Sequence, residues 1–186
     1  MVRQLTIADR LCGELIGPGA VLRPWDDFGD AAPLPFELRW RVLSGMRIAL
    51  LDRRFELVMA RHRPLLEAFL QRTMERVHTL AFTVAIHCMR LVSMRLLMLF
   101  WQLADRFGKV TPGGVHIRVV LSHRDLAELV GAARPSVTVG LSQLAEKRQL
   151  WRMPDGTWML SHEPPEELRE LRSVPRAASA PSARTA

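Results

Sequence analysis

The pattern of apolar and polar residues divides the chain into a first part of short, interrupted segments and a later part of longer, regular ones. From Gly13 to Phe55 the sequence is repeatedly broken by glycine and proline, as in Gly17-Pro18-Gly19 and Pro33-Leu34-Pro35, which leaves room for strands and turns rather than helices. Within this part, apolar residues alternate with arginine along residues 40–44 and 46–51. This alternation predicts two short strands joined at a turn.

From about Pro64 to Gly108 the sequence consists mostly of good helix formers, so two helices are predicted. Along the first helix, a stripe recurs at alternating steps of four and three, which is the seam pattern of a two-stranded coiled coil. The predicted dimer interface consists of Leu66, Leu70, Thr73, Val77, Leu80 and Val84, and the same spacing reaches His87 and Leu91. Packing against the N-terminal strands is the alternative, but three heptads exceed what about 50 residues of strand and turn can cover. The second helix is predicted over residues 92–107.

A predicted strand over residues 115–121 leads into the most informative pattern of the chain. Ser122 and Asp125 nearly form a capping box, which predicts the start of a short helix. Gly131 then allows a tight turn, and Pro135 fits the first turn of a second helix. A short helix, a glycine turn and a second helix with a small, polar outer face form the helix-turn-helix pattern.

Two apolar runs, residues 150–153 and 157–160, flank Pro154-Asp155-Gly156. Asp-Gly between such runs predicts a β-hairpin, and a hairpin directly after a helix-turn-helix is a wing. After Ser161 the composition changes to Glu, Pro, Ala, Ser and Arg, which is typical of a mostly disordered tail.

Composition adds a preference for a polyanionic partner. The 186 residues include 26 Lys and Arg against 19 Asp and Glu, a formal charge of +7, and only Lys109 and Lys147 are lysines. Such a surplus of arginine favours nucleic acid over an acidic membrane surface. A membrane-spanning helix over residues 80–101 is not expected, because His87, Arg90 and Arg95 interrupt the apolar stretch.

Two cysteines give no recognisable metal motif. Cys12 and Cys88 lie far apart, and neither has the spacing of a zinc or iron–sulfur site, so no metal and no cofactor are expected. They are expected to be inert small hydrophobes, with redox sensing as an open alternative. The first residues do not resemble a signal peptide, and a reducing cytoplasm is the expected compartment.

The chain resembles the Crp/Fnr family of bacterial transcription regulators, most strongly over residues 96–160. Two passages carry the likeness: Leu103-Ala104-Asp105-Arg106-Phe107-Gly108, and Leu121-Ser122-His123-Arg124-Asp125-Leu126-Ala127-Glu128-Leu129-Val130-Gly131-Ala132-Ala133-Arg134-Pro135-Ser136-Val137. The resemblance implies an α+β fold of four regions. They are a partial effector-binding β-roll (residues 1–55), a dimerisation helix region (56–91), a winged helix-turn-helix DNA-binding domain (92–162) and a mostly disordered tail (163–186).

The resemblance also implies which residues contact DNA. Ser122 corresponds to a threonine that contacts phosphate, and Arg134 to an arginine that reads guanine in the major groove, where its guanidinium can bond both O6 and N7. Pro135 stands where many relatives have a base-reading glutamate, so the preferred DNA sequence is expected to differ. The expected DNA contacts are Ser122, His123, Arg124, Gly131, Arg134, Ser136, Thr138 and Val139, with His123 and Arg124 on the backbone.

The effector-binding part matches the family less well. Members that bind a cyclic nucleotide carry Gly-Glu-Leu and, shortly after it, an Arg-Ser or Arg-Thr pair. Gly13-Glu14-Leu15 is followed by Arg23, but Pro24 comes next, and the register counted from the dimer helix places Phe36-Glu37 at the pair. No cyclic-nucleotide ligand is therefore expected, and the effector is unknown. The first half of the roll is also missing, as in a truncated start or a divergent regulator.

These observations favour a sequence-specific, DNA-binding transcription regulator that binds a near-palindromic site on double-stranded DNA as a homodimer. A dimerisation or interaction module derived from such a regulator, without DNA binding, is the alternative. An enzyme is not expected, because no nucleophile, base and orienting group occur together in one motif.

Overall fold

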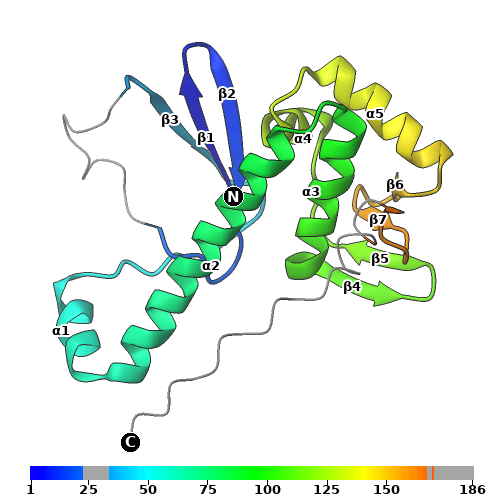
Figure 1. Ribbon diagram of the computed structural model, residues 1–186. Helices are drawn as coiled ribbons and strands as arrows, with labels where there is room; N and C mark the ends of the chain where they lie inside the picture. Colours follow the sequence, from blue (N-terminus) through cyan, green and yellow to red (C-terminus); the bar gives the residue numbers. More distant parts are fainter. Residues whose placement is uncertain (23–33, 167–168, 170–186) are drawn as a thin grey trace, which may run out of the picture.

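The N-terminal part of the computed structural model is a three-stranded antiparallel sheet (Figure 1). Its central strand, β1 (Val2–Ile7), pairs with β2 (Arg10–Leu15) on one side and with β3 (Glu37–Arg41) on the other. Ala8 and Asp9 adopt positive φ angles of 46° and 61° between β1 and β2 and so form a tight hairpin turn. The register places Gln4 opposite Gly13 and Val2 opposite Arg41, on one face of the sheet.

The strand predictions for this part are only partly confirmed. Strand β3 includes Trp40 and Arg41 but ends before the predicted turn, and residues 46–51 form no strand. The apolar side chains there are exposed, and Leu50 is 90% accessible to solvent. The alternating pattern of residues 46–51 permits a strand, but a strand also needs a neighbouring strand with which it forms hydrogen bonds. Strand β1, which the pattern did not predict, has two such neighbours, β2 and β3.

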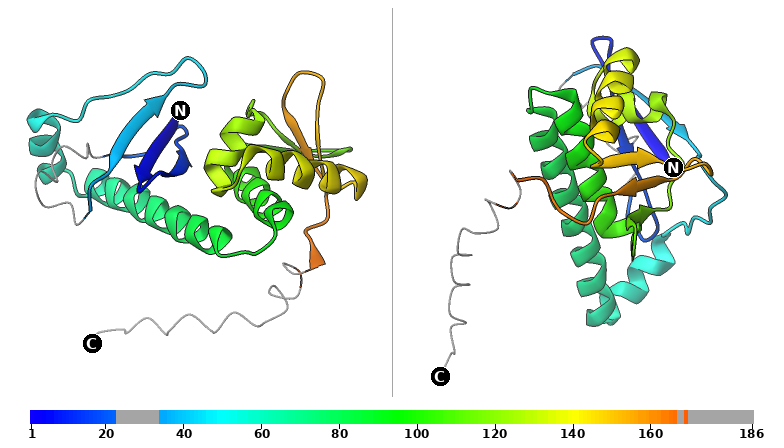
Figure 2. Two further views of the ribbon diagram at one scale, coloured as in Figure 1. Left: turned by 90° about the horizontal axis from the view of Figure 1, so that it is seen from above. Right: turned by 90° about the vertical axis from the view of Figure 1, so that its right-hand side faces the viewer.

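Two helices follow the sheet, and the second is the longest element. Asp52 caps α1 (Arg53–Arg61) by accepting hydrogen bonds from the backbone N–H groups of Arg54 and Phe55, at 3.0 and 3.1 Å. After one intervening residue α2 (Arg63–His87) begins, with a proline in its first turn. Figure 2 shows α2 as a rod that carries α1 at one end and the C-terminal unit at the other, with the sheet beside it.

The C-terminal unit begins with α3 (Val92–Phe107), as predicted. A hairpin follows, formed by β4 (Gly108–Thr111) and β5 (Gly114–Ile117). The strand predicted over residues 115–121 is therefore shorter than expected, because its last residues leave the sheet to enter the next helix. The prediction also missed β4, whose short run Gly-Lys-Val-Thr carries too little apolar alternation to be recognised alone.

The remaining elements form the predicted helix-turn-helix and wing. They are α4 (His123–Val130), α5 (Arg134–Glu146), β6 (Leu150–Arg152) and β7 (Trp158–Leu160). Strands β4, β5, β7 and β6 form one antiparallel sheet in that order. The fold is thus of mixed α+β class, with two antiparallel sheets in the described part of the chain.

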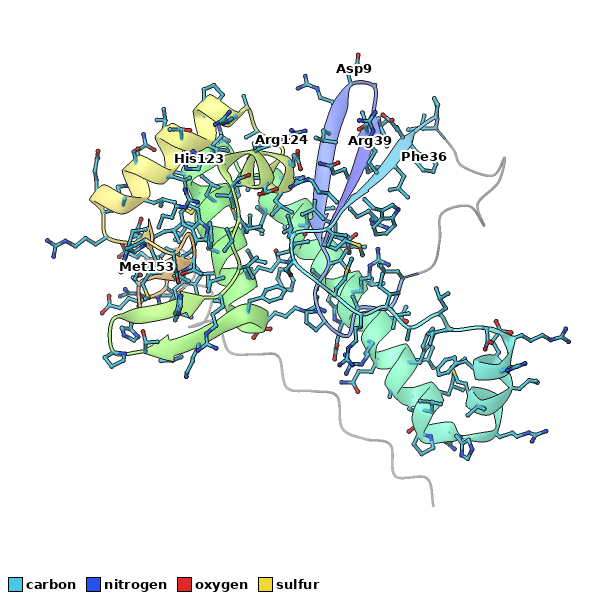
Figure 3. All side chains as sticks on the ribbon, turned by 180° about the vertical axis from the view of Figure 1, so that it is seen from behind. Asp9, Phe36, Arg39, His123, Arg124 and Met153 are labelled. Atoms are coloured by element: carbon cyan, nitrogen blue, oxygen red, sulfur yellow. The ribbon has the colours of Figure 1, made fainter. Side chains whose placement is uncertain are left out.

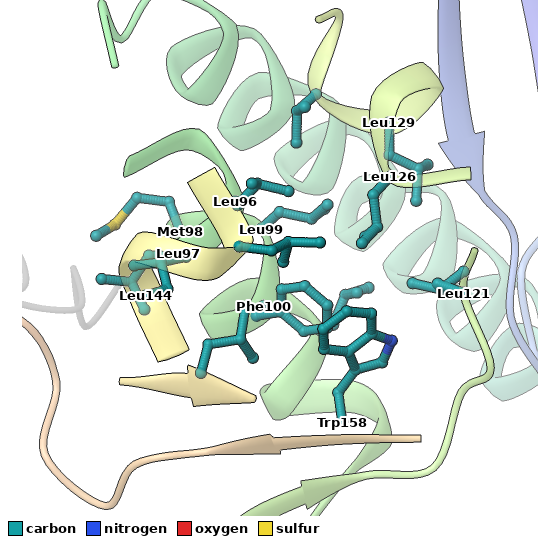
Figure 4. Close-up of a cluster of buried hydrophobic side chains, with 14 of the residues drawn as sticks. Leu96, Leu97, Met98, Leu99, Phe100, Leu121, Leu126, Leu129, Leu144 and Trp158 are labelled. Atoms are coloured by element: carbon teal, nitrogen blue, oxygen red, sulfur yellow. The ribbon is translucent and has the colours of Figure 1, made fainter. Parts of the chain in front are cut away.

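One hydrophobic core holds the C-terminal unit together (Figure 4). Helix α3 runs through it, with Leu96 and Phe100 fully buried. The Phe100 and Trp158 rings lie 5.0 Å apart at 50°, an arrangement in which aromatic rings attract one another beyond simple burial. Trp158 therefore joins the wing to the helices.

The structure describes residues 1–22, 34–166 and 169. Arg23 and Pro24, and most of the predicted tail, lie outside these residues. Among the helices of the described part, none combines the length and the apolar character that crossing a bilayer requires.

Candidate nucleic-acid interface

The first helix of the motif starts at a complete capping box. The Ser122 hydroxyl accepts a hydrogen bond from the backbone N–H of Asp125 (3.2 Å) and donates its own hydrogen to the Asp125 carboxylate (2.6 Å). The backbone N–H of Ser122 donates to the same carboxylate oxygen, at 2.7 Å. The Ser122 hydroxyl hydrogen is thus engaged inside the protein, which leaves the N–H groups of the following turn to face an anion.

The turn between the two helices depends on Gly131. It adopts φ 60° and ψ 45°, the left-handed conformation that glycine adopts with least strain, and ends α4. Near it, Nε2 of His87 donates a hydrogen bond to the carbonyl of Leu129 at 2.9 Å. His87 therefore packs on α4 of its own chain, although the spacing of the predicted seam also reaches it.

Helix α5 has one buried and one exposed face. Val137, Gly140, Leu141 and Leu144 point into the core, and a side chain at Gly140 would meet Ser93 and Leu96 within 3.1–3.3 Å, so α5 packs closely on α3. The opposite face is exposed and consists of Arg134, Ser136, Thr138, Val139 and Ser142. This exposed set includes four of the residues expected to contact DNA.

The α5 N-terminus carries positive charge that no anionic side chain among the described residues pairs with. Its N-cap residue, Ala133, has no side-chain acceptor for the first backbone N–H groups. Arg134 is exposed in this first turn, where the helix dipole is also positive. A guanidinium and free N–H groups at one helix end suit a phosphate or the acceptor edge of guanine.

His123 joins the N-terminus of α4 to the exposed face of α5. Its Nδ1 lies 3.0 Å from the hydroxyl oxygen of Thr138, and that hydroxyl lies 3.2 Å from the carbonyl oxygen of Arg134. Both side chains line an open hollow of about 200 Å³ that also includes Ser142 from α5 and Arg152 from the wing. The hollow places a cation, two hydroxyls and an imidazole on the motif's outer surface.

Arg124 points in a different direction. Its Nε donates to the Glu128 carboxylate at 3.1 Å, and Figure 3 shows its side chain on the side of the N-terminal sheet, away from His123. The Arg124 side chain is still 76% exposed. Of the residues expected on the DNA backbone, His123 lies beside α5, whereas Arg124 lies at the edge of the interface.

The N-terminal sheet packs directly on α4, which the sequence did not reveal. Arg41 of β3 forms ion pairs with Asp125 and with Glu128, the latter at 2.8 Å, and Gln4 of β1 donates to Glu128 at 2.7 Å. Gly13 of β2 allows this approach, because a Cβ there would lie 3.1 Å from the Glu128 backbone. We call this contact the sheet–α4 clamp; it consists of Gln4, Gly13, Arg41, Asp125 and Glu128.

The clamp also controls the charge of the Asp125 carboxylate. Burial alone raises its pKa, since Asp125 is only 4% exposed. Hydrogen bonds from Ser122 and the Arg41 guanidinium outweigh burial, and the pKa of Asp125 lies below its ordinary value. Asp125 is therefore an anion that serves the capping box and the sheet at once.

Helix α2 leaves an apolar stripe open to solvent. Leu66, Leu70, Thr73, Val77 and Val84 of the predicted seam are exposed, and Met74, which the seam pattern omits, is exposed beside them. Leu80 is half-buried. Ile86 is the one buried residue of α2. A helix of 25 residues with so little cover from the described part of the chain has a face available for a partner.

The cysteines and acidic residues form no metal site among the described residues. Burial raises the pKa of the Cys12 thiol, which favours its neutral form, while Cys88 is exposed at the end of α2.

Residues 94–157 match the protein family described as the Crp-like helix-turn-helix domain. Over these residues the chain is similar to Crp-like helix-turn-helix domains. The match begins inside α3 and ends in the wing, so it covers both helices of the motif and the exposed face of α5. The resemblance to the Crp/Fnr family is thereby confirmed for this part of the chain, and helix-turn-helix domains are of the kind that transcription regulators use to bind DNA.

Two similar solved structures share the fold of this chain, and a third aligns with part of it. OCPA-complexed CprK aligns with 87% of this chain and 73% of its own, at 16% identity and a TM-score of 0.55. A CooA variant from Carboxydothermus hydrogenoformans aligns with 65% of this chain and 55% of its own, at 20% identity and a TM-score of 0.54. A CprK variant, also OCPA-complexed, gives 64% and 54% at 20% identity and a TM-score of 0.49.

The chain spans about half the length of the last two structures. No curated protein matches the sequence.

Proposed function

We propose that this Crp-like protein is a homodimeric transcription regulator that binds a near-palindromic site on double-stranded DNA. The observation that carries the proposal is the exposed face of α5, which presents Arg134, Ser136, Thr138 and Val139 from a helix whose other face is buried in the core. A recognition helix needs this combination, because its side chains must reach base edges while the domain holds it rigid.

Individual residues have distinct roles in this proposal. Arg134 bonds O6 and N7 of a guanine, and Val139 contacts a thymine methyl group. Ser136 and Thr138 contact neighbouring base edges or sugars. The first turn of α4, with Ser122, His123 and Arg124, lies along a phosphate strand, while Gly131 shapes the turn. Lys147, Arg148 and Arg152 add exposed positive charge around the contact surface.

Dimerisation through α2 would supply the second half-site. Its exposed stripe is apolar over several turns, as a parallel helix pair requires. Two copies related by a twofold axis would place their α5 helices in successive major grooves about 34 Å apart. The operator would then be nearly palindromic.

The effector is left unassigned. CprK is OCPA-complexed in its structure, and CooA is a CO-dependent transcription factor, but those ligands belong to those proteins. In this chain Glu14 of the Gly-Glu-Leu sequence is paired with Arg3 at 2.5 Å and with Arg76 at 3.0 Å, so its carboxylate is already committed. This pairing supports the expectation that a cyclic nucleotide is not the ligand.

No enzymatic activity is proposed, and a regulator of this kind acts where the DNA is, in the cytoplasm. An interaction module that has lost DNA binding is the competing function. A gel-shift titration of the full-length protein against genomic fragments separates the two, because a regulator retards defined fragments with a steep dependence on salt. A folded dimer that retards no fragment at low salt would contradict the proposal.

Replacement of Arg134 by alanine tests the assigned recognition residue. The variant should lose discrimination at one base pair per half-site, a change of about 1 to 3 kcal/mol, because no other side chain bonds that guanine edge. Selection of binding sites from random DNA by the R134A variant and the wild type measures this directly. Lys147→Ala, which removes a charge at the other end of α5, is the control and should weaken binding to all sequences alike. An unchanged base preference in R134A would rule out the role.

A further inference from the structure

The hydrogen bonds around His123 fix which ring nitrogen carries a hydrogen. The Thr138 hydroxyl has one hydrogen and two neighbours, the carbonyl oxygen of Arg134 at 3.2 Å and Nδ1 of His123 at 3.0 Å. A carbonyl oxygen can only accept, so the Thr138 hydrogen is directed to Arg134. Both contacts are then satisfied only if Nδ1 of His123 carries a hydrogen and donates it to Thr138.

This arrangement determines what His123 offers to a ligand. A neutral imidazole has one N–H group, so Nε2 of neutral His123 presents a lone pair. Nε2 has no hydrogen-bond partner within the described part of the chain. A phosphate oxygen is also an acceptor, and two acceptors do not bond. Only the protonated ring, with a hydrogen on each nitrogen, keeps the Thr138 bond and donates from Nε2 at the same time.

The charges around the hollow link protonation of the His123 imidazole to the binding of an anion. From α5 the hollow is lined by uncharged residues, Thr138 and Ser142 among them, and from the wing by Arg152. On its own helix, Arg124 bonds Glu128, and Asp125 bonds Ser122 and Arg41. The charge that faces the hollow is therefore positive, so the hollow attracts an anion. A bound phosphate reverses this sign and favours the imidazolium.

We propose that His123 contacts a DNA phosphate only when protonated, so that DNA binding tightens as the pH falls from 8 to 5.5. The inference rests on the proposed DNA binding and adds a form of regulation to the same surface. Histidine is the side chain whose ordinary charge change falls in this range. Because backbone phosphates are alike in every sequence, the effect does not require the operator.

The test measures binding of the full-length protein to a non-specific duplex of about 30 base pairs, between pH 5.5 and 8 at constant ionic strength. The wild type should bind roughly five- to tenfold more tightly per protomer at pH 5.5. The slope of log K against log salt should also steepen by about 0.9 per phosphate gained.

Two substitutions test the roles of the two ring nitrogens of His123 separately. In His123→Asn the amide reaches Thr138 in place of Nδ1, and in His123→Gln it reaches toward the Nε2 position. H123N should bind at all pH values as weakly as the wild type does at pH 8. H123Q should bind more tightly than H123N at pH 8, with a similar lack of pH dependence. A pH response that H123N retains in full would overturn the inference.

Substitution of Thr138 tests the role of the His123 proton, because a histidine with only a structural role would leave the pH dependence of DNA binding unchanged in such a variant. In Thr138→Val the constraint on Nδ1 is removed, so neutral His123 can carry its hydrogen on Nε2 and donate to phosphate at pH 8. The ratio of affinities at pH 5.5 and 8 should shrink in T138V and persist in Thr138→Ser, which keeps the hydroxyl. Nitrogen-15 shifts of His123 at pH 8 should show the hydrogen on Nδ1 in the wild type.

The outcomes also distinguish failure of the proposed DNA binding from failure of the proton-dependent contact. No binding to DNA at any pH contradicts the proposed function itself. Binding with equal pH dependence in the wild type, H123N and T138V leaves the proposed function standing and rejects the proton-dependent contact.

Discussion

At the scale of single residues, short-range chemistry made the C-terminal unit predictable. The capping box of Ser122 and Asp125 and the turn at Gly131 depend on residues three or four positions apart, and the structure confirms both. The hydrogen bond from His123 to Thr138 was not predictable, because it joins two helices and depends on the angle between them. Sequence patterns report which face a residue occupies but not which atom it meets across a turn.

The backbone at Gly131 gives a stability prediction. Gly131→Ala should lower the free energy of unfolding by about 1 kcal/mol, because an L-residue is strained at φ 60°. The added methyl itself has room, since its nearest neighbour, the His87 ring, lies 3.7 Å away. Urea unfolding followed by circular dichroism measures the loss. Gly45→Ala, where a Cβ meets nothing within 4 Å, is the control and should change stability little. Equal effects at both positions would contradict the conformational argument.

At the scale of elements, amphipathic helices were easier to predict than strands. Helix α3 occupies the predicted residues because its apolar face repeats over several turns and a glycine follows it. Residues 46–51 have the alternation of a strand but no neighbour, and β4 has a neighbour but little alternation. The sheet–α4 clamp joins positions 87 residues apart, from Arg41 to Glu128, and no local period encodes such a pairing.

The clamp predicts a pH-dependent contribution to stability. Arg41→Met should lower the free energy of unfolding by about 2 kcal/mol near pH 7, because it leaves the buried Asp125 carboxylate without its cation and Glu128 with Arg124 alone. The Asp125 pKa is depressed in the folded protein, so its stabilisation is present above the unfolded pKa of about 3.9 and is lost as the pH falls through the folded value. The difference between R41M and the wild type should therefore shrink in acid.

Urea titrations at pH 7 and at pH 3 measure this difference. Arg39→Met is the matched control on the same strand, because Arg39 pairs with Glu37 on the surface and its side chain is 69% exposed. A loss in R39M as large as that in R41M would mean that removal of any strand arginine, rather than the clamp, destabilises the fold.

At the scale of the whole molecule, the unit that matches the Crp-like domain and the unit that would pair with a second copy are separate. The core lies almost entirely in the C-terminal unit, whereas α2 contributes Ile86 to it and leaves its apolar stripe exposed. The seam predicted from sequence agrees with this exposure except where Leu80 is half-buried and His87 packs on α4. A heptad pattern predicts which residues share a face, but packing against the same chain decides which of them remain free.

This separation predicts that the proposed dimerisation can be removed without unfolding the C-terminal unit. Val77→Glu places a charge in the centre of the exposed stripe, where a partner helix would bury it at a cost of several kcal/mol. Analytical ultracentrifugation should show a monomer at concentrations where the wild type is a dimer. His78→Glu, at an exposed position outside the predicted seam, should remain dimeric.

The same pair of variants tests the link from assembly to DNA binding. V77E should bind a palindromic operator much more weakly than the wild type, yet bind a single half-site with similar affinity, because each α5 helix remains intact and only the second contact is lost. Its thermal unfolding should match that of H78E, since Val77 is half-exposed and lies outside the core. A V77E protein that stays dimeric with full operator affinity would place the dimer interface elsewhere on the molecule.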